Sequence, residues 1–141
     1  MKPKAILVAV NGGRADDEMV KLGCDLAKKG KAIVYLVYVI EVNRSLPLDA
    51  VIDTEIKKAE GILTHAEEVA SDRDAEIETD LIQAREVGPA IVDEAREREV
   101  DLIILGLDYK RRFGIFSLGR VIPYVIEEAP CRVLMCREPM V

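Results

Sequence analysis

Short apolar segments recur along the chain, and longer segments whose apolar residues have helical spacing lie between them. The first apolar segment, Lys4 to Val10, has no polar alternation, which is typical of a strand buried on both faces. The pattern predicts strands over residues 4–10, 32–40, 76–81, 101–106 and 132–137, and helices over residues 15–29, 51–71, 87–98 and 119–128. This order restricts the chain to an α/β fold with a parallel sheet and helices on both of its faces.

The segment over residues 76–81 differs from the other predicted strands, because apolar and acidic residues alternate in it. One set of alternating positions holds Ile77, Thr79 and Leu81, and the other holds Glu76, Glu78 and Asp80. One face of this strand is therefore expected to be solvated, which predicts a place at an edge of the sheet.

Two loops are candidates for a ligand site, because parallel sheets bind ligands beyond the carboxyl ends of strands where the winding reverses. One is the turn Asn11-Gly12-Gly13 after the first strand, and the other runs from Gly106 to Arg120 after the fourth. The second loop contains three successive cations, Lys110 to Arg112, and ends where a helix is predicted to begin. Unpaired N–H groups and the dipole at a helix N-terminus favour an anion, so this loop is a candidate anion site.

Known nucleotide and nucleic-acid motifs fit the second loop poorly. Gly114 to Arg120 has the glycine spacing of a P-loop but lacks its lysine and its Ser or Thr, and GxGxxG does not occur in the chain. Two aromatic residues, Tyr109 and Phe113, flank the three cations, and interleaved aromatic and basic residues are typical of nucleic-acid sites. The net charge of −6 disfavours broad binding to nucleic acid or anionic membranes. A solvated loop, or one facing a phosphate, is therefore the favoured interpretation.

Other features exclude several classes of protein. No stretch reaches the roughly 18 apolar residues that span a membrane, and the run from Ala5 to Val10 is too short for a secretory signal. The cysteines Cys24, Cys131 and Cys136 match no zinc spacing and are expected to be reduced. His65 is the only histidine and has no identifiable catalytic partners. We therefore expect a cytoplasmic protein with no metal site and no catalytic residues.

Three segments carry a resemblance to the universal stress protein family: AILVAVNGG at residues 5–13, VDLIILG at 100–106, and GRVIPYVIEEAPCRVLMCRE at 119–138. The similarity covers essentially the whole chain, so residues 1–141 are expected to form one universal stress protein domain. The resemblance implies a single five-stranded parallel sheet of order 3-2-1-4-5, a Rossmann-like architecture shared with adenine nucleotide alpha hydrolases. It also implies a homodimer through the last strand. The apolar run Val133, Leu134 and Met135 in that strand supports this independently, because a bare apolar edge tends to be paired; burial under a helix is the alternative.

The ATP-binding members of the family carry G-x2-G-x9-G-[ST] after the fourth strand. Gly106 and Gly119 match the first and third glycines, whereas Tyr109 replaces the second and Arg120 replaces the Ser or Thr. Tyr109 adds bulk where the family backbone approaches phosphates, while Arg120 can offer a charged, bidentate contact instead of a hydroxyl. Asn11 replaces the Asp of the first loop. The candidate cofactor-binding residues are Val10, Asn11, Val39, Gly106, Tyr109, Gly119, Arg120 and Val121.

The residues and the resemblance together lead to three functional hypotheses. The first is a stress-response or regulatory module that binds ATP or a related adenine nucleotide, with Mg²⁺ left open and slow hydrolysis at most. Its adenosine would lie near Asn11 and Val39, and its phosphates near Gly106, Gly119 and Arg120. The alternative is a dimeric interaction protein whose pocket is degenerate and binds no nucleotide. The third, an enzyme acting on adenylated substrates, rests on fold analogy alone.

Overall fold

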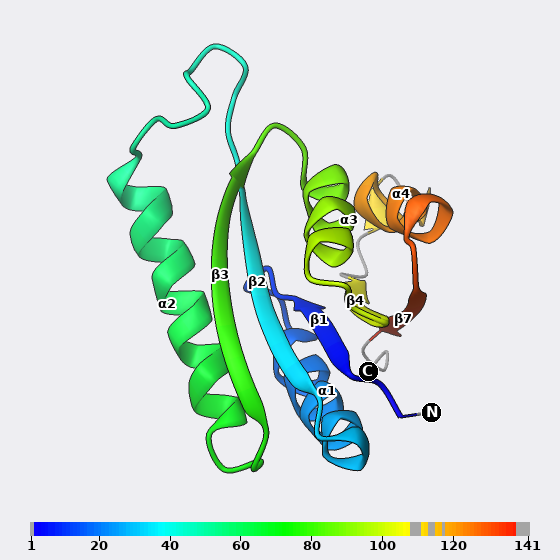
Figure 1. The fold of residues 1–141 in the computed structure, drawn as a ribbon. Coiled ribbons are helices and arrows are strands. Elements are labelled where there is room, and N and C mark those ends of the chain that lie inside the picture. Colours follow the sequence, from blue (N-terminus) through cyan, green and yellow to red (C-terminus); the bar gives the residue numbers. More distant parts are fainter. Residues whose placement is uncertain (1, 108–110, 113–114, 117, 138–141) are drawn as a thin grey trace.

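The fold is a five-stranded parallel sheet between two layers of helices, as seen in a computed structural model that describes residues 2–107, 111–112, 115–116 and 118–137 (Figure 1). The strands of the sheet are β1 (Ala5–Ala9), β2 (Ile33–Glu41), β3 (Glu76–Ala84), β4 (Leu102–Leu107) and β7 (Arg132–Arg137). Their order, β3-β2-β1-β4-β7, is the 3-2-1-4-5 order predicted above, since β7 is the fifth strand of this sheet. The fold prediction is therefore confirmed.

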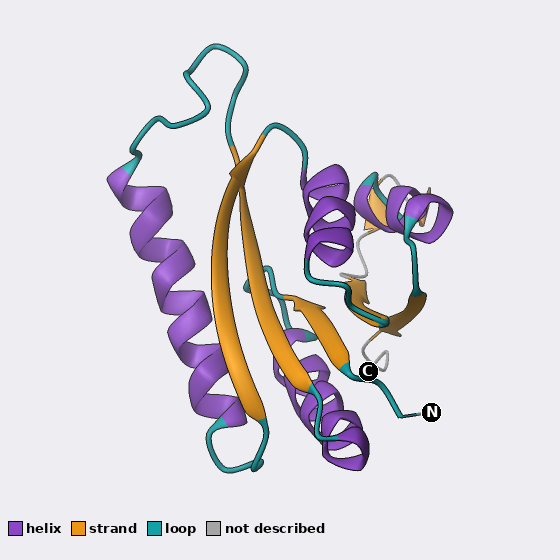
Figure 2. Ribbon diagram, viewed as in Figure 1, coloured by secondary structure: helices purple, strands orange, loops and turns teal. Residues whose placement is uncertain are grey.

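Two helices cover each face of the sheet, and Figure 2 shows the layers clearly. The helices α1 (Asp16–Gly30) and α2 (Asp53–Ala70) pack on one face, and α3 (Val87–Glu97) and α4 (Val121–Glu128) pack on the other. Each face has its own apolar core. Ile6 and Val8 of β1 point into the core under α1 and α2, whereas Leu7 points into the core under α3 and α4. Because both directions are buried, the pleat of β1 needs apolar residues at every position, which explains the lack of alternation in its sequence.

The predicted elements agree with the structure except at some boundaries and in one loop. β3 lies at an edge as expected, but it extends three residues beyond the predicted end, to Ala84, because it stays paired with β2 as far as Glu41. The helix expected from residue 119 begins at Val121. The short antiparallel strands β5 (Arg111–Arg112) and β6 (Ile115–Phe116) lie in a stretch predicted to be loop.

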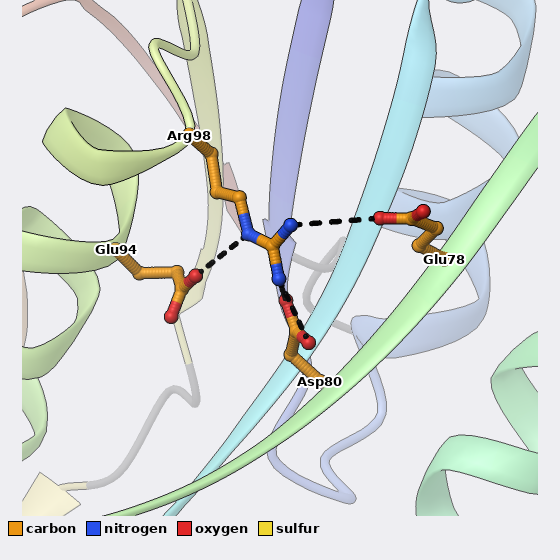
Figure 3. A network of polar contacts seen from close by, with 4 residues as sticks. All are labelled: Glu78, Asp80, Glu94 and Arg98. Carbon is orange, nitrogen blue, oxygen red and sulfur yellow. Dashed lines mark hydrogen bonds and ion pairs between the residues drawn. The ribbon is translucent and has the colours of Figure 1, made fainter.

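Arg98, immediately after α3, connects this helix to the edge strand β3 (Figure 3). Its Nε donates to Glu94 Oε1 at 2.9 Å, its Nη2 donates to Asp80 at 3.0 Å, and its Nη1 lies 3.7 Å from Glu78. The guanidinium also lies 4.9 Å from the centre of the Tyr35 ring. The hydrogen bond to Glu94 and the charge of Asp80 raise the pKa of Arg98 above its ordinary value. The acidic residues of β3 thus do more than face solvent: two of them hold the end of α3 against the sheet.

Candidate functional site

A cavity of about 530 Å³ lies at the carboxyl end of the sheet, on the face covered by α3 and α4. It lies where the winding of the chain reverses: β1 leads to α1 on one face, and β4 is followed by α4 on the other. The two strands are neighbours, so the connections that leave them diverge and open a space between them. The Val10 N–H donates to the Val37 carbonyl at 3.0 Å, which holds the end of β1 beside β2 at the floor of this space.

One side of the cavity is an apolar wall that we define by residues of β2, α3 and β4. Its members are Val37, Val39, Val87, Ile91 and Leu105. Ile91 and Leu105 are almost fully buried, and the Arg98 contacts at the other end of α3 help to keep this helix in place. Such a surface suits a flat, weakly polar ring system better than a charged group.

The loop between β1 and α1 forms a second side and is held by the buried carboxylate of Asp16. Asp16 is 6% exposed and accepts the N–H groups of Gly12 at 2.7 Å and Asn11 at 3.2 Å. Asn11 Oδ1 accepts the Gly13 N–H at 2.7 Å, which closes an Asx turn. Gly12 has φ +83°, a conformation that favours glycine. Sequence reasoning placed Asp16 only in the first turn of a helix and missed its role in fixing the loop that carries Asn11.

The opposite side, which we call the α4 end of the cavity, consists of Gly119, Arg120 and Val121. Gly119 has φ +69° with open space around it, so backbone conformation and not crowding explains the glycine. Arg120 is the exposed N-cap residue of α4. The first N–H groups of a helix have no intrahelical acceptor, and Pro123 in the first turn has no N–H to satisfy. Arg120 and the start of α4 thus line the same end of the cavity, and a cationic residue beside a helix N-terminus is an arrangement that can hold an anion.

Gly106 lines the cavity with its backbone, but its missing side chain is explained on the other face of the sheet. A β-carbon there would lie 2.9 Å from Met19 Sδ and 3.1 Å from the Ala15 β-carbon. Both residues belong to the start of α1, which packs closely over β4. A glycine at this position therefore permits close packing of α1, whatever the cavity contains.

Seven of the eight candidate cofactor-binding residues line this one cavity: Val10, Asn11, Val39, Gly106, Gly119, Arg120 and Val121. Tyr109 lies outside the described residues, as do Lys110, Phe113, Gly114 and Ser117. The ligand contact expected of Tyr109 remains a prediction. The sequence reasoning missed Val87 and Ile91, which α3 contributes to the apolar wall. Helical periodicity places Ile91 in a core, but it gives no sign that the core opens into a cavity.

The remaining chemically active side chains do not form a reaction centre in the part of the chain that the structure describes. His65 Nε2 lies 2.9 Å from Asp17 Oδ1, and both side chains are largely exposed. Cys24, Cys131 and Cys136 are free, and burial raises the pKa of each thiol, which makes them poor nucleophiles. Among the described residues, no three His, Cys, Asp or Glu side chains gather as metal ligands. No helix within the described ranges is long and apolar enough to cross a bilayer.

Comparison with known proteins gives one consistent family. Residues 2–137 match the universal stress protein family. The universal stress protein MJ0531 of Methanocaldococcus jannaschii is 29% identical over 142 residues, which cover 96% of this chain and 83% of that protein. A universal stress protein from Archaeoglobus fulgidus superposes with a TM-score of 0.78 at 24% identity, covering 94% of this chain and 97% of the other. A structure from the same organism in complex with dAMP has a TM-score of 0.75 at 25% identity, with coverages of 96% and 98%.

The packing role of Gly106 predicts a loss of stability on Gly106→Ala. The added β-carbon would press on Met19 and Ala15, and overpacking of this kind costs about 1–3 kcal/mol. Gly61→Ala is the matched control, because a β-carbon in the interior of α2 meets nothing within 4 Å and should add about 0.5–1 kcal/mol of stability. Urea unfolding of both variants measures the difference. An unchanged midpoint for Gly106→Ala would show that Met19 and Ala15 of this region can move aside without a loss of stability.

Proposed function

Since this chain belongs to the universal stress protein family, we propose that it binds an adenine nucleotide in the cavity between β1 and β4 and acts as a regulatory, stress-response module. The observation that carries this proposal is the meeting of an apolar wall and an anion-holding helix N-terminus in one cavity of about 530 Å³. A nucleotide has the same division, with a flat, weakly polar ring system at one end and phosphate at the other. The dAMP complex of the Archaeoglobus fulgidus relative supports this ligand class.

The two ends of the cavity suggest how the nucleotide would lie. The base would pack on the apolar wall beside Val39, with the adenosine near Asn11. The phosphate would reach Gly119, Arg120 and the backbone of Val121 and Gly106. Arg120 would supply a charge-assisted hydrogen bond where the ATP-binding relatives have a hydroxyl. Mg²⁺, if ATP is the nucleotide, would be held chiefly by the phosphates, which is how this ion binds in many nucleotide sites.

The proposed role is binding and not turnover. Among the described residues, no Asp, Glu, His or Cys lines this cavity, and burial shifts the thiols towards their protonated form. Hydrolysis of a bound nucleotide would therefore be slow at most. The three free cysteines support a location in the reducing cytoplasm.

A bound nucleotide should be detectable directly. The protein is purified without added nucleotide and denatured, and the supernatant is examined by liquid chromatography and mass spectrometry. The protein freed of ligand is then heated with AMP or ATP. At 100 times its Kd a ligand stabilises by about 2.7 kcal/mol, which raises the Tm of a chain of this size by about 5–10 °C. No co-purifying nucleotide and an unchanged Tm at millimolar concentrations would leave the degenerate-pocket alternative.

Arg120→Ala should weaken AMP binding about tenfold, because an exposed charge-assisted contact to phosphate lies at the low end of its usual range. Arg44→Ala is the matched control, because it removes the same charge from a residue that does not line the cavity. Arg44 is exposed on the loop after β2. Isothermal titration of both variants separates a local contact from a general charge effect. Equal losses in the two variants would remove the assigned role of Arg120.

We also propose that the protein is a homodimer through β7. Within the described residues this strand has a neighbour on one side only, and Met135 is 46% exposed on it. Val133 and Leu134 pack partly against the two apolar cores, one on each face, so the pairing surface is the strand edge together with Met135. An exposed apolar edge of this kind is stabilised when a second copy pairs with it.

Met135→Lys should convert the dimer to monomers, because the charge would be buried in the paired edge. Leu81→Lys is the control, since Leu81 is 38% exposed on the opposite edge strand, β3. Light scattering after size exclusion gives the mass of each variant. A dimer that persists in Met135→Lys would place the interface on another surface.

A further inference from the structure

We infer that Gly88 and Tyr124 are positioning residues for the nucleotide: their contact sets where the α4 end of the cavity lies. Neither residue lines the cavity. Gly88 is buried in the first turn of α3, and Tyr124 lies in the middle of α4. The inference rests on the proposed function, because it concerns how the phosphate of the same nucleotide is held.

The two helices meet at Gly88 with no room for a side chain. A β-carbon on Gly88 would lie 3.1 Å from Tyr124 Cδ1 and 3.2 Å from both the β-carbon and Cγ of Tyr124. Rotation of the tyrosine ring can relieve the first contact. It cannot relieve the contact with the β-carbon, which is fixed to the backbone of α4. A side chain at position 88 would therefore push α4 away from α3 by a few tenths of an ångström.

Of the two helices, α4 is the one that can move. Ile91, Val92 and Ala95 of α3 are buried against the sheet, and the Arg98 contacts hold the end of this helix (Figure 3). By contrast, α4 has eight residues and buries only Ile122 and Val125. A hydrogen bond from Arg96 to the Glu128 carbonyl, 3.3 Å long, ties its far end to α3. The Tyr124 N–H donates to the Arg120 carbonyl at 3.4 Å, so a displacement at Tyr124 would also shift the start of α4.

The N-terminal end of α4 carries the phosphate position of the site but not the base position. Arg120 and Val121 belong to the start of α4, whereas the apolar wall lies on β2, α3 and β4. A shift of α4 would therefore change the distance between the base position and the phosphate position. Contacts to the nucleoside would be kept, and the hydrogen bonds to phosphate, which depend steeply on distance and angle, would weaken.

The test compares AMP with adenosine, because the ratio of their Kd values reports the phosphate contacts alone. In Gly88→Ala we expect AMP affinity to fall about three- to tenfold while adenosine affinity stays within about twofold. Gly61→Ala, with the same substitution in open space on α2, should leave both affinities unchanged. Equal losses for the two ligands in Gly88→Ala, or no loss, would overturn the positioning role.

Tyr124→Gly gives a second route to the same contact, because it removes the β-carbon as well as the ring atoms and leaves Gly88 intact. In this background Gly88→Ala should reduce the AMP-to-adenosine preference by less than it does in the parent chain. A reduction of the same size in both backgrounds would show that the effect does not pass through Tyr124. Parent protein that binds neither ligand would refute the proposed function, and this inference with it. Parent protein that prefers AMP, with a preference unchanged by Gly88→Ala, would refute the inference alone.

Discussion

The burial of β1 on both faces and both edges is the constraint on which the rest of this structure depends. β1 pairs with β2 on one side and β4 on the other, and its residues Ile6, Leu7 and Val8 are wholly buried. A strand in this position must be apolar throughout, and the helices that cover it must come from opposite faces. The connection after β1 and the one after β4 therefore diverge at the carboxyl end of the sheet, and the cavity lies between them.

The glycines near this cavity are required for different physical reasons. The family motif gives Gly106 and Gly119 the same role, but the structure does not. Gly106 allows α1 to pack closely on β4, since a β-carbon would meet Met19 and Ala15. Gly119 adopts a left-handed conformation with free space around it. Gly88, which belongs to no motif, permits the close approach of α3 and α4. The width of the site thus depends as much on packing between helices as on residues that would touch a ligand.

The sequence was sufficient for the order of the elements, because the apolar segments and helical periodicities are regular and the strand order follows from the family resemblance. It also selected seven of the residues that line the cavity. It gave no indication of which groups the buried or partly buried carboxylates contact. The role of Asp16 in holding the loop of Asn11 is one example, and the link from Arg98 to Glu78 and Asp80 is another. From the sequence alone a carboxylate is assumed to be solvated. Only the fold shows which backbone N–H or guanidinium it contacts.

The sequence also gave no indication that residues of α3 form part of the apolar wall of the cavity. Val87 and Ile91 have the spacing of any core-facing helix residues, and only the position of α3 at the divergence of the connections makes them line the cavity. Arg120, which replaces a Ser or Thr of the family motif, is the reverse case, because the sequence did single it out. Arg120 departs from the family motif in sequence, yet the structure places it at the N-cap of α4, where its charge adds to the positive end of the helix dipole.

We propose that an adenine nucleotide lies between the apolar wall and the start of α4. Titration of the ¹⁵N-labelled protein with AMP, followed in ¹H–¹⁵N correlation spectra, tests it most directly. We expect the largest shifts at the amides of Val10, Val39, Gly119 and Val121, all of which line the cavity. The amides of Lys31 and Arg132, at the amino end of the sheet, should not move. Shifts centred on that opposite end, or none at millimolar AMP, would contradict it.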